Sequence, residues 1–163
     1  MTPPVNYVVM GVSGCGKTTV GAAFAATIGG QFVDGDDLHP PENVAKMASG
    51  QPLTDADRWP WLDLVAGALT GNVVIGCSAL KRAYRDRIRG GAEDGAGPVR
   101  FLHLAGSQHV IAARMAARPG HFMPLGLLDS QFATLEPLGV DEDGVTVDID
   151  QPIGFIVAAL MAR

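Results

Sequence analysis

Gly11-Val12-Ser13-Gly14-Cys15-Gly16-Lys17-Thr18 is the stretch of this sequence that decides the fold. It follows the apolar run 5–10 and opens a helical run that ends at residue 28. The stretch fits the phosphate-binding loop pattern, which is a glycine, four further residues and then Gly-Lys-Thr, placed between a strand and a helix. Its glycines let backbone N–H groups approach phosphate oxygens, and the helix directs its positive dipole end at the same anion. The stretch therefore predicts a site for a nucleoside triphosphate.

The side chains of the loop have separate expected roles. Lys17 can reach the β- and γ-phosphates as a catalytic residue, and the Thr18 hydroxyl can bind Mg²⁺. Cys15 has a further expectation, because a thiol near a helix N-terminus and a lysine ionises more readily than usual. A lowered pKa of Cys15 predicts that alkylation inactivates the protein and that ATP protects it. We expect ATP to contact Gly11, Ser13, Gly14, Cys15, Gly16, Lys17, Thr18 and Thr19.

Length and composition describe a globular chain of one domain, residues 1–163, with 47% hydrophobic and 18% charged residues. The net charge of −5 argues against a nucleic-acid partner, since nucleic-acid-binding domains are usually basic. The apolar runs are too short to cross a bilayer, and residues 1–6 show no signal-type segment, so we expect a cytoplasmic protein without a membrane partner. Cys15 and Cys77 do not make a disulfide framework.

Strand-type and helix-type segments alternate along the chain. This alternation predicts the α/β class, with a five-stranded parallel sheet and helices on both of its faces. Ligands of such sheets bind beyond the carboxyl ends of the strands, so the loop, 34–36, 77–78 and 114–124 should share one edge. Strands are expected at 5–10, 31–34, 72–77, 99–104 and 145–149. Helices are expected at 17–28, 41–48, 55–69, 79–89, 107–117, 125–135 and 152–161. Asp55 is the expected cap of the third helix and Ser78 that of the fourth, and 90–98 is expected to be a loop.

Asp34 and Asp36 follow the second expected strand on either side of Gly35. One carboxylate would anchor Mg²⁺, and the other would accept a hydrogen bond from the attacking hydroxyl. We assign the metal to Asp34, together with Thr18, and the base to Asp36, although the sequence leaves the order of the pair open. The alternative for both is a solvated acidic turn. Since the third strand ends at Cys77 without an acid, the metal must depend on Thr18, the phosphates and this pair.

Several blocks of sequence resemble the gluconokinase family. They are Asp34-Gly-Asp-Asp-Leu-His-Pro, Lys46-Met-Ala-Ser-Gly-Gln-Pro-Leu, Asp55-Ala-Asp-Arg-Trp-Pro-Trp-Leu, Cys77-Ser-Ala-Leu-Lys, Tyr84-Arg-Asp, Gly120-His-Phe-Met-Pro, Ser130-Gln-Phe and Leu135-Glu-Pro-Leu. The resemblance covers nearly the whole chain and departs at Cys15, where serine is expected. It implies a P-loop kinase fold with a small lid, similar to shikimate kinase and nucleoside monophosphate kinases. It also implies ATP-dependent phosphorylation of D-gluconate at its 6-hydroxyl to 6-phospho-D-gluconate and ADP, with Mg²⁺, in a homodimer.

A sugar acid offers one carboxylate and a row of hydroxyls, which suit a planar guanidinium and Asp, His or amide groups. In the acceptor-binding segment 38–70 we expect Arg58 to hold the carboxylate, the alternative being a surface pair with Asp55. His39 is expected to bind a sugar hydroxyl, or else to be an ordinary loop histidine.

A basic cluster supplies further candidates. Lys81 and Arg85 are four residues apart and are expected to share a helix face that contacts substrate or phosphate. Arg82 and Asp86 have the same spacing and read as an ordinary surface pair. The expected substrate contacts are Asp34, Asp36, His39, Arg58, Lys81, Arg85 and His121.

A lid is expected over 114–127. Arg114 and Arg118 flank the break at Pro119 and resemble lid arginines that close over ATP, with Arg118 catalytic. The alternative is two C-terminal arginines favoured by the helix dipole. Gln151 follows the fifth strand, where related kinases hold the adenine.

Two alternatives to a gluconate kinase stay open in the sequence. One is a kinase for shikimate or another small hydroxy acid, and the other is a nucleotide-binding regulator without turnover. The intact Lys17, Thr18 and acidic pair argue against the regulator.

Overall fold

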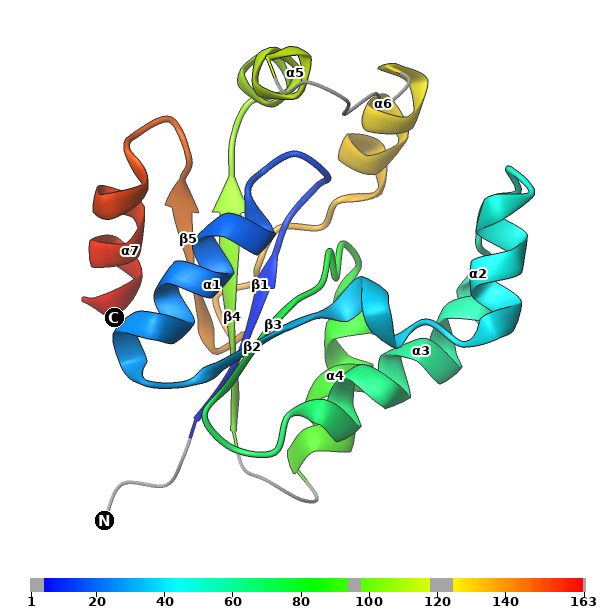
Figure 1. Ribbon diagram of the computed structural model, residues 1–163, viewed down its shortest axis with the longest axis horizontal. Coiled ribbons are helices and arrows are strands. Elements are labelled where there is room, and N and C mark those ends of the chain that lie inside the picture. Colours follow the sequence, from blue (N-terminus) through cyan, green and yellow to red (C-terminus); the bar gives the residue numbers. More distant parts are fainter. Residues whose placement is uncertain (1–4, 94–97, 118–124, 163) are drawn as a thin grey trace.

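A five-stranded sheet forms the centre of the computed structural model, which describes residues 5–93, 98–117 and 125–162 (Figure 1). The strands are β1 (Asn6–Met10), β2 (Gln31–Asp34), β3 (Val73–Gly76), β4 (Val99–Ala105) and β5 (Gly144–Asp148). They pair in the order β2-β3-β1-β4-β5, and every pair is parallel. The expected fold class is confirmed, and β1 lies where the strand order reverses, the usual position of a ligand crevice.

Helices cover both faces of this sheet (Figure 1). They are α1 (Lys17–Ile28), the 3-10 turn η1 (Gly35–Leu38), α2 (Pro41–Ala48), α3 (Asp55–Ala68), α4 (Arg82–Glu93), α5 (Gln108–Ala116), α6 (Leu125–Thr134) and α7 (Ile153–Met161). Helices α1 and α7 lie on one face and α3 and α4 on the other, while α5 and α6 lie beyond the carboxyl ends of the strands. In the described residues no helix is long and apolar enough to span a bilayer.

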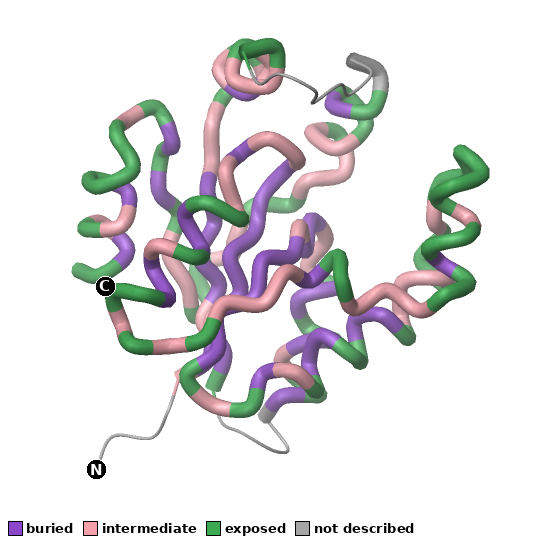
Figure 2. The backbone as a smooth tube through the Cα atoms, in the orientation of Figure 1, coloured by how far each residue is buried: buried purple, intermediate pink, exposed green. Residues whose placement is uncertain are grey.

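The core consists of two layers separated by the sheet. Val8 and Met10 point into the layer under α3 and α4, and Val9 between them points into the layer under α1 and α7. All three are fully buried, as are most residues of the central strands (Figure 2). Burial on both faces explains why β1 reads as a continuous apolar run in the sequence.

The first turn of α3 is capped by Thr54, so the expectation of Asp55 as the cap was wrong. The Thr54 side chain accepts the Asp57 N–H at 3.2 Å, and the Asp57 carboxylate accepts the Thr54 N–H at 2.9 Å. This reciprocal capping box satisfies two backbone donors at once, whereas Asp55 lies inside the helix.

Helix α4 differs from its expected bounds at both ends. It begins at Arg82, because residues 77–81 form an irregular segment in which Ala79 has a φ of 44°. It continues to Glu93 through two glycines that were expected to end it. A Cβ on Gly91 would lie 2.8 Å from the Cβ of Ala66 on α3. The absence of a side chain at Gly91 therefore permits close packing of the two helices.

Arg85 is fully buried in the core, and its expected contact with substrate is corrected accordingly. Its Nε donates to Glu142 Oε1 at 2.8 Å and its Nη2 to Glu142 Oε2 at 3.0 Å. Its Nη1 donates to the Ala79 carbonyl at 2.9 Å. Burial alone would raise the pKa of Glu142, but hydrogen bonds from Arg85 and the Gly139 N–H lower it to about 2. The Arg85 guanidinium therefore joins α4 to the segment before β5.

Glutamine at position 142 would leave the Arg85 guanidinium buried without a counter-ion. Removing one partner of a buried ion pair costs about 3–5 kcal/mol, so Glu142→Gln should lower the free energy of unfolding by that amount in a denaturant titration. The pKa of Glu142 is about 2 when folded against 4.5 for the free side chain. The pair's contribution is therefore complete above pH 4.5 and is lost as the pH falls toward 2, where wild type and variant should converge.

Asp63→Asn is the matched control for this experiment. It removes the exposed ion pair between Asp63 and Arg87, which lies on α4 as Arg85 does. Exposed pairs contribute little to stability. Equal unfolding midpoints for Glu142→Gln and Asp63→Asn would contradict a stabilising role of the buried pair.

Candidate active site

The phosphate loop leaves β1 in a conformation that its glycines make possible. Gly11 has a φ of 145° and Gly14 a φ of 84°, both in the region that favours glycine. A Cβ on Gly11 would lie 2.7 Å from Cys15 Sγ and 2.8 Å from the Leu104 carbonyl oxygen, and one on Gly14 would lie 2.6 Å from Met115 Cγ. Side chains at these two positions would push the loop away from β4 and α5.

Lys17 folds back over the loop that precedes it. Its Nζ donates to the carbonyl oxygens of Gly11 at 3.0 Å and Val12 at 3.1 Å. The ammonium group is thus held beside the loop. Its positive charge offsets part of the rise in the pKa of Asp36 that burial and the Asp34 charge cause. The structure brings the expected lysine and the expected base to one edge of the sheet.

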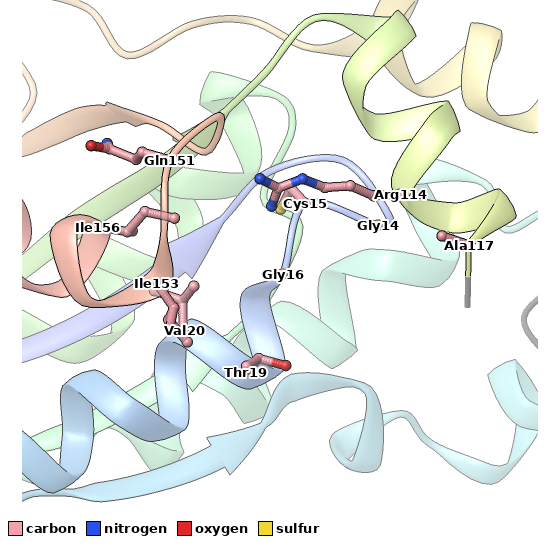
Figure 3. Close-up of a pocket in the computed structure, with 10 residues that line it drawn as sticks. All are labelled: Gly14, Cys15, Gly16, Thr19, Val20, Arg114, Ala117, Gln151, Ile153 and Ile156. Atoms are coloured by element: carbon pink, nitrogen blue, oxygen red, sulfur yellow. The ribbon is translucent and has the colours of Figure 1, made fainter. Parts of the chain in front are cut away.

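A cavity of about 370 Å³ lies between the loop and α7, and we name it the α7-side cavity (Figure 3). It is lined by Gly14, Cys15, Gly16, Thr19, Val20, Arg114, Ala117, Gln151, Ile153 and Ile156. Arg114 donates to the Ile149 carbonyl oxygen. The Gln151 amide points away from Arg114 and donates to the Asp148 carbonyl oxygen at 2.7 Å. Both polar side chains therefore donate to backbone carbonyl groups at the carboxyl end of β5.

A second cavity of about 760 Å³ lies between the loop, η1, α3 and α6, and we name it the α3-side cavity. It is lined by Ser13, Asp36, His39, Met47, Gly50, Gln51, Pro52, Leu53, Arg58, Trp61, Ser78, Leu127, Ser130 and Gln131. Four residues expected from the sequence, Ser13, Asp36, His39 and Arg58, meet here. Since Ser13 lines this cavity and Gly14 lines the other, the phosphate loop forms the wall between them.

The carboxylates of Asp34, at the end of β2, and of Asp36, in η1, have different surroundings. Asp34 Oδ1 accepts the Asp36 N–H at 3.0 Å and caps η1. Partial burial raises the pKa of Asp36, the negative charge of Asp34 raises it further, and the Lys17 ammonium offsets part of the rise. Two carboxylates whose charges repel each other favour a cation nearby.

Magnesium fits this group of oxygen donors. Among the residues that the structure describes, no three His, Cys, Asp or Glu side chains gather into a complete metal site. Mg²⁺ needs no such cage, because it binds through one or two carboxylates, water and substrate phosphates. Thr18 is exposed at the start of α1, and Asp34 is half-buried at the carboxyl end of β2.

Arg58 and Lys81 gather around one carboxylate, that of Asp55. Both cations line an adjoining cavity of about 300 Å³, which shares Arg58 with the α3-side cavity. Lys81 Nζ lies 3.2 Å from Asp55 Oδ2, and Arg58 Nη1 lies 3.7 Å from Asp55 Oδ1. The Tyr84 hydroxyl accepts from Arg58 Nη1 at 3.2 Å and donates to Asp55. Hydrogen bonds from Tyr84 and Lys81 lower the pKa of Asp55. Arg58 therefore pairs with Asp55, which was the alternative expected for it, and it also lines the α3-side cavity.

Gln131 is a site residue to which the sequence assigned no role. Its Oε1 accepts the Ser13 N–H at 2.7 Å, and its Nε2 donates to Ser13 Oγ at 3.0 Å. These bonds join α6 to the phosphate loop across 118 residues of chain. Only the Ser130-Gln-Phe block pointed to this position, since no local spacing relates a glutamine to a loop so far away.

The remaining expected residues lie elsewhere or cannot be placed. Arg85 is in the core, away from both cavities. Arg118 and His121 lie outside the described residues, as does half of the expected lid.

Cys15 does not have the reactive thiol that was expected. Its side chain is 1% exposed, and burial raises its pKa more than the Lys17 charge lowers it. Cys77 is also buried, and burial raises its pKa to about 12. The lysine favours the thiolate, but the burial of the thiol against Gly11 outweighs this effect.

Both thiols should therefore resist modification in the folded protein. A chromogenic aryl disulfide at neutral pH should react with Cys15 and Cys77 at least about tenfold more slowly than after unfolding in denaturant, because access and thiolate content are both low. Rapid release of one equivalent of chromophore from the folded protein, mapped to Cys15, would contradict this assignment.

Comparisons with known proteins agree with this geometry. A family model described as an AAA domain matches residues 7–138. A gluconokinase of Gluconobacter oxydans is 51% identical, over 88% of this chain and 82% of its own. The crystal structure of a gluconokinase from Sinorhizobium meliloti superposes with a TM-score of 0.88 at 49% identity, covering 99% of this chain and 92% of that one. A shikimate kinase from Bacteroides thetaiotaomicron, at 21% identity and TM-score 0.67, with 97% of each chain covered, shares the fold alone. This chain belongs to the gluconokinase family.

Proposed function

We propose that this protein transfers the γ-phosphoryl group of ATP to the 6-hydroxyl of D-gluconate, giving 6-phospho-D-gluconate and ADP. The observation that carries the proposal is the placement of two cavities on opposite sides of one phosphate loop. A donor nucleotide and an acceptor can then meet only at the loop, as phosphoryl transfer requires. The family membership identifies the acceptor as gluconate, which the chemistry of the α3-side cavity supports.

ATP occupies the α7-side cavity in this proposal. The apolar side chains Val20, Ile153 and Ile156 accommodate the adenosine, and the loop amides and Lys17 bind the phosphates. Arg114 contributes positive charge at the same cavity. Thr18 and Asp34 would hold Mg²⁺, which supplies charge neutralisation for the transferring group when bound.

Charge sets the direction in which gluconate binds. Arg58 and Lys81 carry two positive charges, and Asp55 carries one negative charge. The surplus positive charge suits the single carboxylate of a sugar acid, and Arg58 can bind that carboxylate through its planar guanidinium. The hydroxyl chain then extends toward Ser13 and Asp36, where the cavity meets the phosphate loop.

Asp36 orients the attacking hydroxyl in this arrangement. Its carboxylate accepts the hydroxyl's hydrogen bond and so directs the oxygen lone pair at the γ-phosphorus. Arg118, His121, the homodimer and the cytoplasmic location stay predictions from the sequence.

A panel of acceptors tests the proposed substrate. ADP release in a coupled assay should depend on gluconate, with kcat/KM at least about tenfold above that for shikimate or a neutral polyol of equal length, because only gluconate satisfies both ends of the cavity. Arg58→Ala should raise the KM for gluconate while leaving ATP binding unchanged. ADP formation with shikimate alone, or equally without any acceptor, would overturn the proposal.

A substitution at the acidic turn tests the proposed base. Asp36→Asn should lower kcat more than tenfold and leave ATP affinity nearly unchanged, because the amide cannot accept the hydroxyl's proton. Asp37→Asn is the matched control, since Asp37 is exposed on the same turn and does not line the cavity. A near-normal rate in Asp36→Asn would move the role to Asp34.

A further inference from the structure

Asn43 is a buried polar residue on α2 that none of the steps above uses. It is 5% exposed, and its side-chain Nδ2 has two neighbours. One is the Asp57 carbonyl oxygen on α3, which accepts from Nδ2 at 3.0 Å. The other is His39 Nδ1, at 3.2 Å from the same nitrogen.

The Asp57 carbonyl decides which way the Asn43 amide points. A backbone carbonyl oxygen only accepts hydrogen bonds, so the Asn43 atom facing it must be the NH₂ group. Reversing the amide would bring two oxygen acceptors together in a buried place, which costs about 1–3 kcal/mol. The same NH₂ group therefore donates to His39 Nδ1, and an imidazole nitrogen that accepts carries no proton. The ring proton of His39 must lie on Nε2.

The His39 ring is also fixed in its orientation. It stacks on Trp61 with ring centroids 4.1 Å apart and an angle of 15° between the planes. Trp61 is itself held, because its Nε1 donates to the Gly35 carbonyl oxygen at 2.8 Å. Within the described residues no protein group accepts from His39 Nε2, and the side chain lines the α3-side cavity.

The charges around His39 favour the neutral ring. Partial burial lowers its pKa, the Asp36 carboxylate opposes this, and the Arg58 guanidinium lowers the pKa again. The net change is downward from the ordinary value of 6.5. A neutral ring is also the only form that can accept from Asn43.

We propose that His39 recognises the acceptor as a neutral Nε2–H donor, and that Asn43 is the positioning residue that selects this tautomer. The inference rests on the proposed function and specifies how the protein recognises the hydroxyl groups of the acceptor. His39 offers only a donor and the Asp36 carboxylate only an acceptor, both in one cavity. Hydroxyl groups satisfy both at once, because each can donate and accept. This end of the cavity thus selects a hydroxylated chain over a carbonyl or a second carboxylate.

Nuclear magnetic resonance on the whole protein tests the tautomer directly. In ¹⁵N-labelled wild type at neutral pH, long-range ¹H–¹⁵N correlations should show His39 Nε2 protonated and Nδ1 unprotonated. The chain has four histidines, and the spectrum of His39→Gln identifies the resonances that belong to His39. Adding gluconate should shift the Nε2–H signal, and adding a polyol without the carboxylate should shift it less. A proton on Nδ1, or a doubly protonated ring, would overturn the assignment.

Variants separate recognition from a merely structural role. Glutamine places its amide nitrogen near the position of Nε2, so His39→Gln should retain a donor, whereas His39→Asn places its nitrogen near Nδ1. We expect His39→Asn to lower kcat/KM for gluconate about tenfold, and His39→Gln to restore most of that loss. ATP affinity should stay within about twofold in both. Equal losses in the two variants would overturn the role of Nε2–H.

Asn43→Asp tests the positioning role. Its carboxylate would accept from a protonated Nδ1, so the ring should become the other tautomer or the imidazolium, visible in the same spectra. Glu42→Gln on the exposed first turn of α2 is the control and should leave the ring signals unchanged. An unchanged His39 tautomer in Asn43→Asp would overturn the role of Asn43. Loss of gluconate turnover in wild type would overturn the proposed function, whereas a wrong tautomer in an active wild type overturns this inference alone.

Discussion

The register of three strands is the constraint on which the site depends. Gly76 of β3 lies opposite Val9 of β1 and Asp34 of β2, so these strands end at the same level. Two backbone bonds extend the alignment past the sheet, from Cys77 N–H to the Val9 carbonyl and from Gly11 N–H to the Ser78 carbonyl. The phosphate loop, the acidic turn and the turn before α4 therefore leave the sheet side by side. A shift of one residue in any of these strands would separate the loop from its carboxylates.

The basic cluster of α4 shows how one short segment serves two purposes. Arg85 and Arg89 face inward to Glu142, where burial makes a paired charge a structural requirement. Lys81 lies before the start of the helix and lines, together with Arg58, the cavity that adjoins the α3-side cavity. The cavity keeps its positive charge because the inward arginines have a counter-ion of their own. The start of α4 at Arg82 divides the cluster, because Lys81 lies before the helix at the site and Arg85 and Arg89 lie within it toward the core.

The sequence predicted what depends on local pattern. The loop, the buried strands and the acidic turn can each be recognised from a few consecutive residues. The parallel sheet follows from the alternation of strands and helices along the chain. Arg85 was misplaced because α4 begins three residues later than expected, which puts Lys81 outside the helix and removes the shared face. Cys15 was misjudged because burial cannot be seen in neighbouring residues. Gln131 was missed because its partner lies 118 residues away.

Helix α2 is held to the rest of the protein by few contacts, and most of its surface is exposed (Figure 2). Asn43 and the Lys46–Asp57 ion pair attach it to α3, and the turn before it carries His39. In our proposal the residue that positions His39 thus lies on a peripheral element, whereas the phosphate loop follows the central strand of the sheet. Substitutions on α2 can therefore alter how His39 meets the acceptor while the loop between β1 and α1 keeps its sequence and conformation.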